Sequence, residues 1–82
     1  YGGGDADALT NLVFAEALSQ STFAGFIITV LVHTDMAGPH LHHAGNAAQK
    51  ARYLSKVTAG ELITAVGITE PGAGSDVAGI RT

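Results

Sequence analysis

The sequence changes its character at Gly60, and this change constrains the fold more than any other feature. Ahead of Gly60, apolar residues recur mostly at the three- and four-residue spacing of an α-helix. Beyond it, residues 62–69 read Leu-Ile-Thr-Ala-Val-Gly-Ile-Thr, an apolar and β-prone run that proline and glycine then interrupt. The sequence therefore predicts a mainly α chain, with a helical domain in residues 1–60 and the first strand and loop of a β domain in residues 61–82.

Helical signals are clearest at the two ends of the first region. Apolar residues recur at helical spacing over residues 7–20, where Asp5 and Asp7 are candidate N-caps. Residues 46–49 read Asn-Ala-Ala-Gln, which has the form of a capping box. A helix is expected to start there and to run up to Gly60, since glycine commonly follows the last helical turn.

The middle of the helical region fits more than one kind of structure. Residues 21–34 fit helical spacing, but the run 27–32 is rich in β-branched residues and suits a strand as well. A short further helix is expected to begin near Pro39 and to stop at Gly45, because proline suits the first helical turn and glycine the position after the last.

Composition excludes several classes of protein. The 82 residues suffice for one small domain, and they are 46% hydrophobic with a net charge of -3, unlike a disordered polyelectrolyte or a basic nucleic-acid binder. The absence of cysteine excludes disulfides. The longest apolar run, residues 26–32, is far shorter than the roughly 20 residues that span a bilayer. No initiator Met or signal peptide is visible, so we expect a piece from inside a longer protein and a cytoplasmic location.

Residues 69–76 read Thr-Glu-Pro-Gly-Ala-Gly-Ser-Asp and are the segment best suited to carry chemistry. Two glycines and a hydroxyl after a strand can bring backbone amides close to an anion, so the segment is a candidate phosphate cradle. It is neither a P-loop nor a dinucleotide fingerprint, because the lysine of the first and the third glycine of the second are missing. An ordinary tight turn, whose glycines only supply a positive φ, explains the pattern at least as well.

Two other kinds of site have weaker support. Ser75 lacks the Gly-x-Ser-x-Gly elbow of a nucleophile, and its neighbour Asp76 is poorly placed to orient a base. His40 and His43 would share one face of a helix and could bind a metal ion, but no third ligand accompanies them at helical spacing. Solvated or packed histidines are the simpler explanation, and no metal is expected.

Several stretches together resemble the central region of the acyl-CoA dehydrogenases. The block Thr-Glu-Pro-Gly-Ala-Gly-Ser-Asp is a strong signature of that family, and the Gln-Lys-x-x-Tyr-Leu helix ahead of it is a second. The resemblance covers all 82 residues, but only a minority of the family's length. The stretches are residues 44–54 (AGNAAQKARYL), 60–62 (GEL), 68–76 (ITEPGAGSD) and 79–82 (GIRT).

The resemblance implies a fold. It implies the end of an N-terminal all-helical domain, a fragment of a helical bundle, followed by the first strand and loop of a middle β-barrel domain. It also implies that the ambiguous run in residues 26–32 is helical.

The resemblance implies a flavin site as well. Val66 and Ile68 match positions that lie along the flavin ring, in contact through backbone or side chain. Thr69 matches a residue that hydrogen-bonds the pyrimidine edge of the flavin, where a donor stabilises negative charge on the reduced ring. Gly74 and Ser75 match the loop that approaches the flavin pyrophosphate, and Ser75 also matches a contact to the acyl-CoA thioester arm.

The implied activity belongs to a parent protein rather than to this chain. The parent removes a proton from Cα of an acyl-CoA thioester and passes a hydride from Cβ to FAD, giving the trans-2-enoyl thioester. Its implied partners are the acyl-CoA substrate, an electron-transfer flavoprotein and further copies of itself in a homo-oligomer. The catalytic glutamate of the family lies in a C-terminal domain outside these residues, and neither Glu61 nor Glu70 matches it. The 82 residues are therefore expected neither to turn over nor to retain FAD.

Two departures from the family pattern leave the acyl chain length open. Val66 stands where many relatives have an aromatic residue, and Ser55 stands where a proline is common. Two alternatives from other classes also remain. The first is a noncatalytic helical module that self-associates through a stripe formed by Phe23, Ile27, Val30 and Leu31. The second is a metal-binding module built on the paired histidines.

Overall fold

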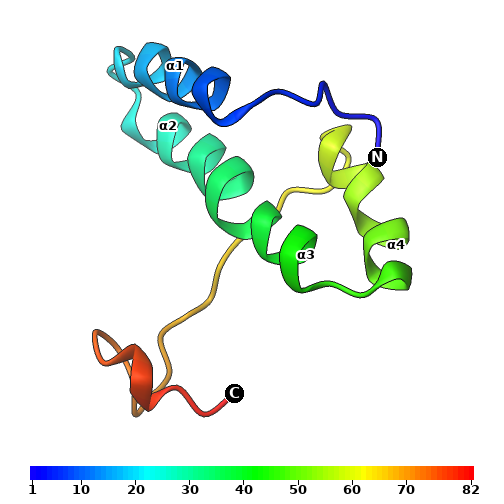
Figure 1. Cartoon of the computed structure of the whole chain (residues 1–82). Coiled ribbons are helices and arrows are strands. Elements are labelled where there is room, and N and C mark those ends of the chain that lie inside the picture. The colour runs from blue at the N-terminus through cyan, green and yellow to red at the C-terminus, as the bar shows by residue number, and fades with distance from the viewer.

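The computed structural model describes all of residues 1–82, and every α-helix in it precedes Gly60 (Figure 1). The prediction of a mainly α chain is confirmed. The α-helices are α1 (Ala8–Ser19), α2 (Ala24–Leu31), α3 (Gly38–Ala44) and α4 (Ala47–Thr58); a π-helical segment, η1 (Val32–Ala37), joins α2 to α3, and a 3-10 turn, η2 (Val77–Gly79), lies near the C-terminus.

Helix α1 begins where an aspartate caps it. The Asp7 Oδ1 accepts hydrogen bonds from the Thr10 hydroxyl at 2.7 Å and from the Thr10 backbone N–H at 2.8 Å. These bonds, the hydroxyl first, lower the pKa of Asp7 below its ordinary value of 3.8. Asp5, the other candidate cap, instead lies ahead of the helix with a positive φ of 51°.

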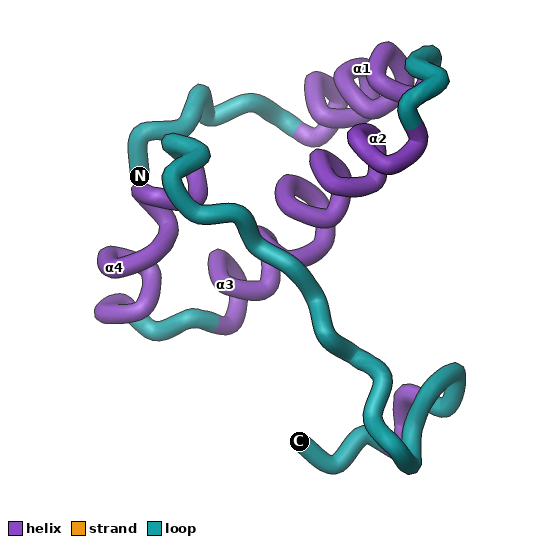
Figure 2. The backbone as a smooth tube through the Cα atoms, turned by 180° about the vertical axis from the view of Figure 1, so that it is seen from behind, coloured by secondary structure: helices purple, strands orange, loops and turns teal.

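The ambiguous run in residues 27–32 is helical, as the family resemblance implied. The cost of β-branched residues in a helix is only a few tenths of a kcal/mol each, so tertiary packing overrides it readily. Helix α2 lies beside α1 in both views of the backbone (Figures 1 and 2). Within α2, the Thr29 hydroxyl donates a hydrogen bond to the Gly25 carbonyl at 2.7 Å.

The short helix expected from near Pro39 to Gly45 is confirmed as α3, with Pro39 in its first turn and Gly45 as its C-cap, but the sequence did not predict that it continues α2 without a break. The chain stays helical from residue 24 to residue 44 because η1 bridges the two helices. In this wider turn the Gly38 N–H donates to the His33 carbonyl, five residues back. A Cβ added to Gly38 would lie 2.8 Å from that oxygen, so only glycine fits. The π turn thus lets the continuous helix of residues 24–44 include Pro39, which has no N–H to donate, without a break.

Helix α4 begins and ends as its sequence predicts. Asn46 and Gln49 form both bonds of the capping box, each at 2.9 Å. At the other end Gly60 adopts a positive φ of 76°, and the Glu61 N–H donates to the Lys56 carbonyl at 2.9 Å. The Gly60 N–H also donates to the Val57 carbonyl, which completes a Schellman motif and turns the chain out of the helix.

The residues after Gly60 leave the helices as an extended segment (Figure 2). Residues 63–69 form no ladder, and the only bridge in this part of the chain joins Glu70 to Ala73. The predicted strand is therefore not shown. A β-prone sequence favours an extended backbone, but a strand also needs a neighbour for its N–H and C=O groups, and these residues have none.

Very little of the chain is buried. Only Ala37, Leu54 and Ala73 are buried, and the accessible surface is 6343 Å². A folded monomer of this mass would expose about 4,600 Å². No helix is long and apolar enough to cross a membrane. Large apolar side chains on and next to the first two helices are exposed: Leu9, Leu12, Val13, Phe14, Phe23, Phe26 and Ile28.

The stripe proposed for self-association is not uniformly exposed. Phe23 is 75% exposed, but Ile27, Val30 and Leu31 are half-buried. Three of its four members are thus partly covered within the chain, which does not favour this stripe as an interface between copies.

The π turn generates a testable pair of glycine substitutions. Gly38→Ala should destabilise the chain by about 1–3 kcal/mol, because the new methyl group meets the His33 carbonyl. Gly25→Ala, in open space on α2, should stabilise it by about 0.5–1 kcal/mol because alanine loses less backbone entropy in a helix. Urea unfolding followed by far-UV circular dichroism compares the two. Equal effects would contradict the proposed role of Gly38.

Candidate functional site

The candidate site is the C-terminal loop, which stands apart from the helices (Figure 1). It opens with a tight turn in which the Glu70 N–H donates to the Ala73 carbonyl at 2.9 Å and the Ala73 N–H donates back at 3.1 Å. Pro71 and Gly72 occupy the two central positions of the turn, where proline presets φ. Ala73 is 4% exposed and is the only buried residue outside the helical region.

The carboxylate of Glu70 closes the loop. Its Oε2 accepts the Arg81 backbone N–H at 3.0 Å, and its Oε1 accepts the Thr82 backbone N–H at 3.1 Å. The Thr82 side chain, followed by these two backbone bonds, lowers the pKa of Glu70 below its ordinary value of 4.5. Both oxygens are thus engaged in holding the end of the chain against its turn.

The two glycines of the signature are not explained by the chain's own backbone. Neither Gly72 nor Gly74 has a positive φ, so a turn that demands glycine is not the reason for them. A Cβ added to either would meet no atom within 4 Å. A glycine that neither backbone strain nor internal crowding requires is suited to the close approach of another molecule.

Backbone donors are free beside these glycines. The N–H groups of Gly74, Ser75 and Asp76 donate no hydrogen bond within the chain, and all three residues are exposed. Successive unpaired amides in a turn form a concave donor surface that suits phosphate oxygens. The adjoining hollow, lined by Glu70, Asp76 and Arg81, carries two carboxylates and is less suited to an anion.

The structure brings the predicted flavin residues into one continuous segment but not into a closed cavity. Val66, Ile68 and Thr69 lie in the extended run, and Gly74 and Ser75 lie in the loop that follows it. Val66 is 37% exposed and Ile68 is 46% exposed. Because residues two apart in an extended chain share a face, these two side chains project to the same side and Thr69 to the other.

The four histidines form no metal site. No group of three or more His, Cys, Asp or Glu side chains is arranged to hold a metal ion. The His40 Nδ1–H donates to the Met36 carbonyl, and the rings of His42 and His43 meet edge to face at 4.9 Å. Local packing thus accounts for these three rings.

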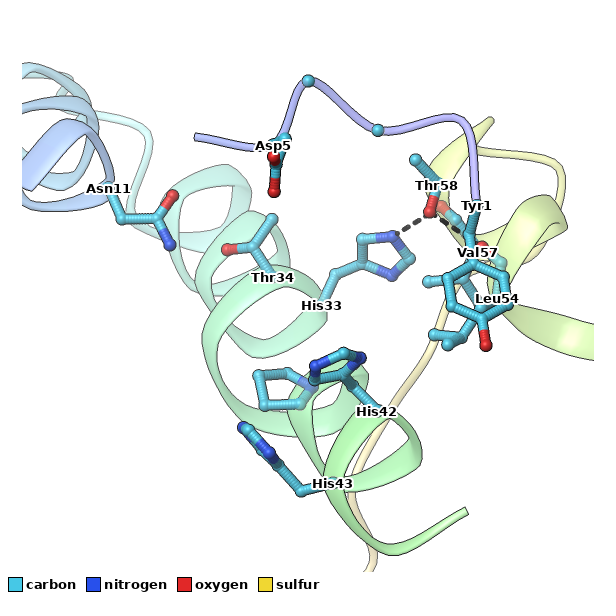
Figure 3. Close-up of a pocket in the computed structure, with 14 residues that line it drawn as sticks. Tyr1, Asp5, Asn11, His33, Thr34, His42, His43, Leu54, Val57 and Thr58 are labelled. Atoms are coloured by element: carbon cyan, nitrogen blue, oxygen red, sulfur yellow. Dashed lines mark hydrogen bonds between the residues drawn. The ribbon is translucent and has the colours of Figure 1, made fainter. Parts of the chain in front are cut away.

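His33 is the functional candidate that sequence reasoning missed. It faces an open hollow between η1, α4 and the N-terminal segment (Figure 3), and its ring reaches two other parts of the chain. Nε2 lies 3.2 Å from the Val57 carbonyl, and Nδ1 lies 3.0 Å from the Thr64 backbone nitrogen and 2.9 Å from the Thr64 hydroxyl. No sequence signal marks this, because Thr64 is 31 residues away.

The partners of His33 fix its protonation pattern. The Val57 carbonyl can only accept, so Nε2 carries the proton and donates. The Thr64 backbone N–H can only donate, so Nδ1 is the acceptor. The ring is therefore neutral, with its proton on Nε2.

The closure of the loop by Glu70 should depend on pH. Because its pKa in the folded chain is lowered, the stabilisation is fully present above about pH 4.5 and is lost as the pH falls through the folded value. The amide resonances of Arg81 and Thr82 should move together over that range in an NMR titration. Glu70→Gln should abolish the shared transition, whereas Glu61→Gln should leave it unchanged. A transition that survives Glu70→Gln would contradict the assignment.

Comparison with known proteins points to one family. The family described as "Acyl-CoA dehydrogenase, N-terminal domain" matches residues 1–61. The mitochondrial long-chain specific acyl-CoA dehydrogenase of Mus musculus is 38% identical over 84 residues, which cover 100% of this chain and 19% of the relative. An acyl-CoA dehydrogenase of Bacillus subtilis is 32% identical over 83 residues, covering 100% of this chain and 21% of the relative. No solved structure matches the chain.

A bacterial relative with a different substrate name matches similarly. The short-chain specific acyl-CoA dehydrogenase of Clostridium acetobutylicum is 36% identical over 76 residues, covering 93% of this chain and 20% of the relative. The chain thus spans about a fifth of the length of the curated relatives it matches. With the family match over residues 1–61 and identities above 30% along nearly the whole chain, this chain belongs to the acyl-CoA dehydrogenase family.

Proposed function

We propose that the full-length protein containing this chain is an FAD-dependent acyl-CoA dehydrogenase that converts an acyl-CoA thioester to the trans-2-enoyl-CoA. The observation that carries the proposal is the unpaired backbone at Gly74 and Ser75, next to glycines that the chain's own packing does not require. Family membership supports the same reading, since the relatives are named acyl-CoA dehydrogenases. FAD supplies the hydride acceptor when it is bound.

The loop is proposed to hold the flavin pyrophosphate. The free N–H groups of Gly74 and Ser75 can donate to phosphate oxygens, and the open space at Gly74 lets the phosphate approach the backbone. The exposed Ser75 hydroxyl is proposed to contact the thioester arm of the acyl-CoA as well. Substrate and cofactor would then meet at one turn of the chain.

The extended segment is proposed to lie along the flavin ring. Val66 and Ile68 are apolar and exposed on one face, as a contact to the flat ring requires. Thr69 can donate to the pyrimidine edge, where the charge of the reduced ring develops, and a donor placed there favours reduction. These residues bind and orient the cofactor and hold no reacting proton.

The catalytic base is proposed to lie outside these 82 residues. Glu70 is engaged by two backbone amides through both oxygens, which leaves it unsuited to accept a substrate proton. We therefore propose that the 82 residues alone neither turn over nor retain FAD. A domain boundary near Gly60, a homo-oligomer and an electron-transfer flavoprotein partner belong to the same proposal. The cytoplasmic location stays a prediction, because several relatives are named mitochondrial.

Flavin affinity of the full-length protein tests the proposal. Thr69→Val removes the hydroxyl donor proposed for the pyrimidine edge, so the flavin dissociation constant should rise about 3- to 10-fold, whereas Ser75→Ala removes a hydroxyl assigned to the acyl-CoA and keeps the backbone N–H, so it should leave flavin affinity nearly unchanged. Thr69→Val should also lower the flavin reduction potential, since the donor favours the reduced ring. Titration of the apoprotein with FAD, with Ser55→Ala on exposed α4 as control, measures the effect. Wild-type flavin affinity in Thr69→Val would refute the assignment.

A further inference from the structure

We propose that His33 is a positioning residue that sets the register of residues 62–69 against the helices. Through this register it determines which face of the segment Val66 and Ile68 present to the flavin, so the inference rests on the proposed function. His33 itself touches neither cofactor nor substrate in this role. Its effect passes through Thr64.

The contact with Thr64 is the only hydrogen-bonded tie along this part of the chain. Between Leu62, which donates to the Lys56 carbonyl, and Glu70, which opens the loop, no backbone group joins a backbone–backbone hydrogen bond. Thr64 alone is bound there, through its backbone N–H and its hydroxyl. The hydroxyl also lies 3.4 Å from the His33 carbonyl. An otherwise free segment is thus held at one residue.

One hydrogen-bonded residue is enough to fix which side chains of an extended chain lie on which face. Side chains and amides repeat every two residues, so Thr64, Val66 and Ile68 lie on one face and the residues between them on the other. A slip by one residue would exchange the two faces and turn Val66 and Ile68 away from their side. The tie at Thr64 therefore selects between two opposite presentations of the segment.

The other end of the tie is anchored firmly. His33 lies in η1, where its own carbonyl accepts the Gly38 N–H, and its Nε2–H donates to the Val57 carbonyl in the last turn of α4. The Val57 carbonyl also accepts the Gly60 N–H, and its second lone pair is available for the imidazole. The imidazole thus joins η1, the end of α4 and the extended segment, and it is half-buried among them.

Two substitutions separate the two sides of the ring. Asn can place an oxygen acceptor near the position of Nδ1 and so retain the bond from the Thr64 N–H, while losing the donor to Val57. Gln can place a donor near the position of Nε2 and so retain the bond to Val57, while losing the acceptor for Thr64. His33→Ala loses both, and His43→Ala, at an exposed ring on α3, is the matched control.

The experiment measures two quantities in the full-length protein: hydrogen exchange at the Thr64 amide and the dissociation constant for FAD. In His33→Ala and His33→Gln, Thr64 exchange should quicken about tenfold and the dissociation constant should rise about tenfold. In His33→Asn and His43→Ala both should stay close to the wild-type values. If His33 only stabilised the helices, His33→Asn and His33→Gln would not differ according to whether they keep the acceptor for the Thr64 N–H.

The outcomes distinguish this inference from the proposed function. Unchanged Thr64 exchange in His33→Ala would overturn the inference, whatever happens to FAD. Faster exchange with unchanged FAD affinity would overturn the link between the register and the flavin. A wild-type protein that binds no FAD would instead overturn the proposed function, and Thr64 exchange would still decide whether His33 sets the register.

Discussion

The left-handed turn at Gly60 is the constraint on which the placement of residues 61–82 depends. A positive φ at this residue lets the Glu61 N–H return to the Lys56 carbonyl, which ends α4 and reverses the chain. Only after that reversal can Thr64, four residues later, meet the ring of His33 on a different helix. A residue with a Cβ would be strained in this conformation, so glycine is required by the backbone itself.

The parts of the fold that could be predicted from sequence are those with local causes. The capping box at Asn46 and the cap at Asp7 act within a single turn, and both helices begin where these residues predict. The π turn could not be predicted, because it depends on the Gly38 N–H meeting a carbonyl five residues back. The β-prone run after Gly60 predicted a strand, which the structure does not show, because pairing of that run needs a neighbour that its own residues cannot supply.

The candidate site likewise has features with local causes, which the sequence predicts, and features that depend on distant residues, which it does not. Its signature loop is visible in the sequence, and the structure shows the tight turn within it, whereas the phosphate cradle stays a proposal that the backbone angles of Gly72 and Gly74 support. The role of Glu70 depends on amides 11 and 12 residues away. The bond between His33 and Thr64 spans 31 residues and leaves no periodic signal. Contacts of this range are set by topology, which spacing along the chain does not encode.

The π turn also bears on how the sequence can change by insertion and deletion. A π turn holds one residue more than an α-helical turn in the same rod, so removing one residue between Val32 and Ala37 could restore a regular α-helix there. Because the π turn absorbs the extra residue, such a deletion would leave the downstream helix in nearly the same orientation relative to α2, whereas the same deletion in a regular α-helix would rotate it by about 100°. Alignments across the continuous helix of residues 24–44 should therefore be checked for a one-residue gap before positions after it are treated as equivalent.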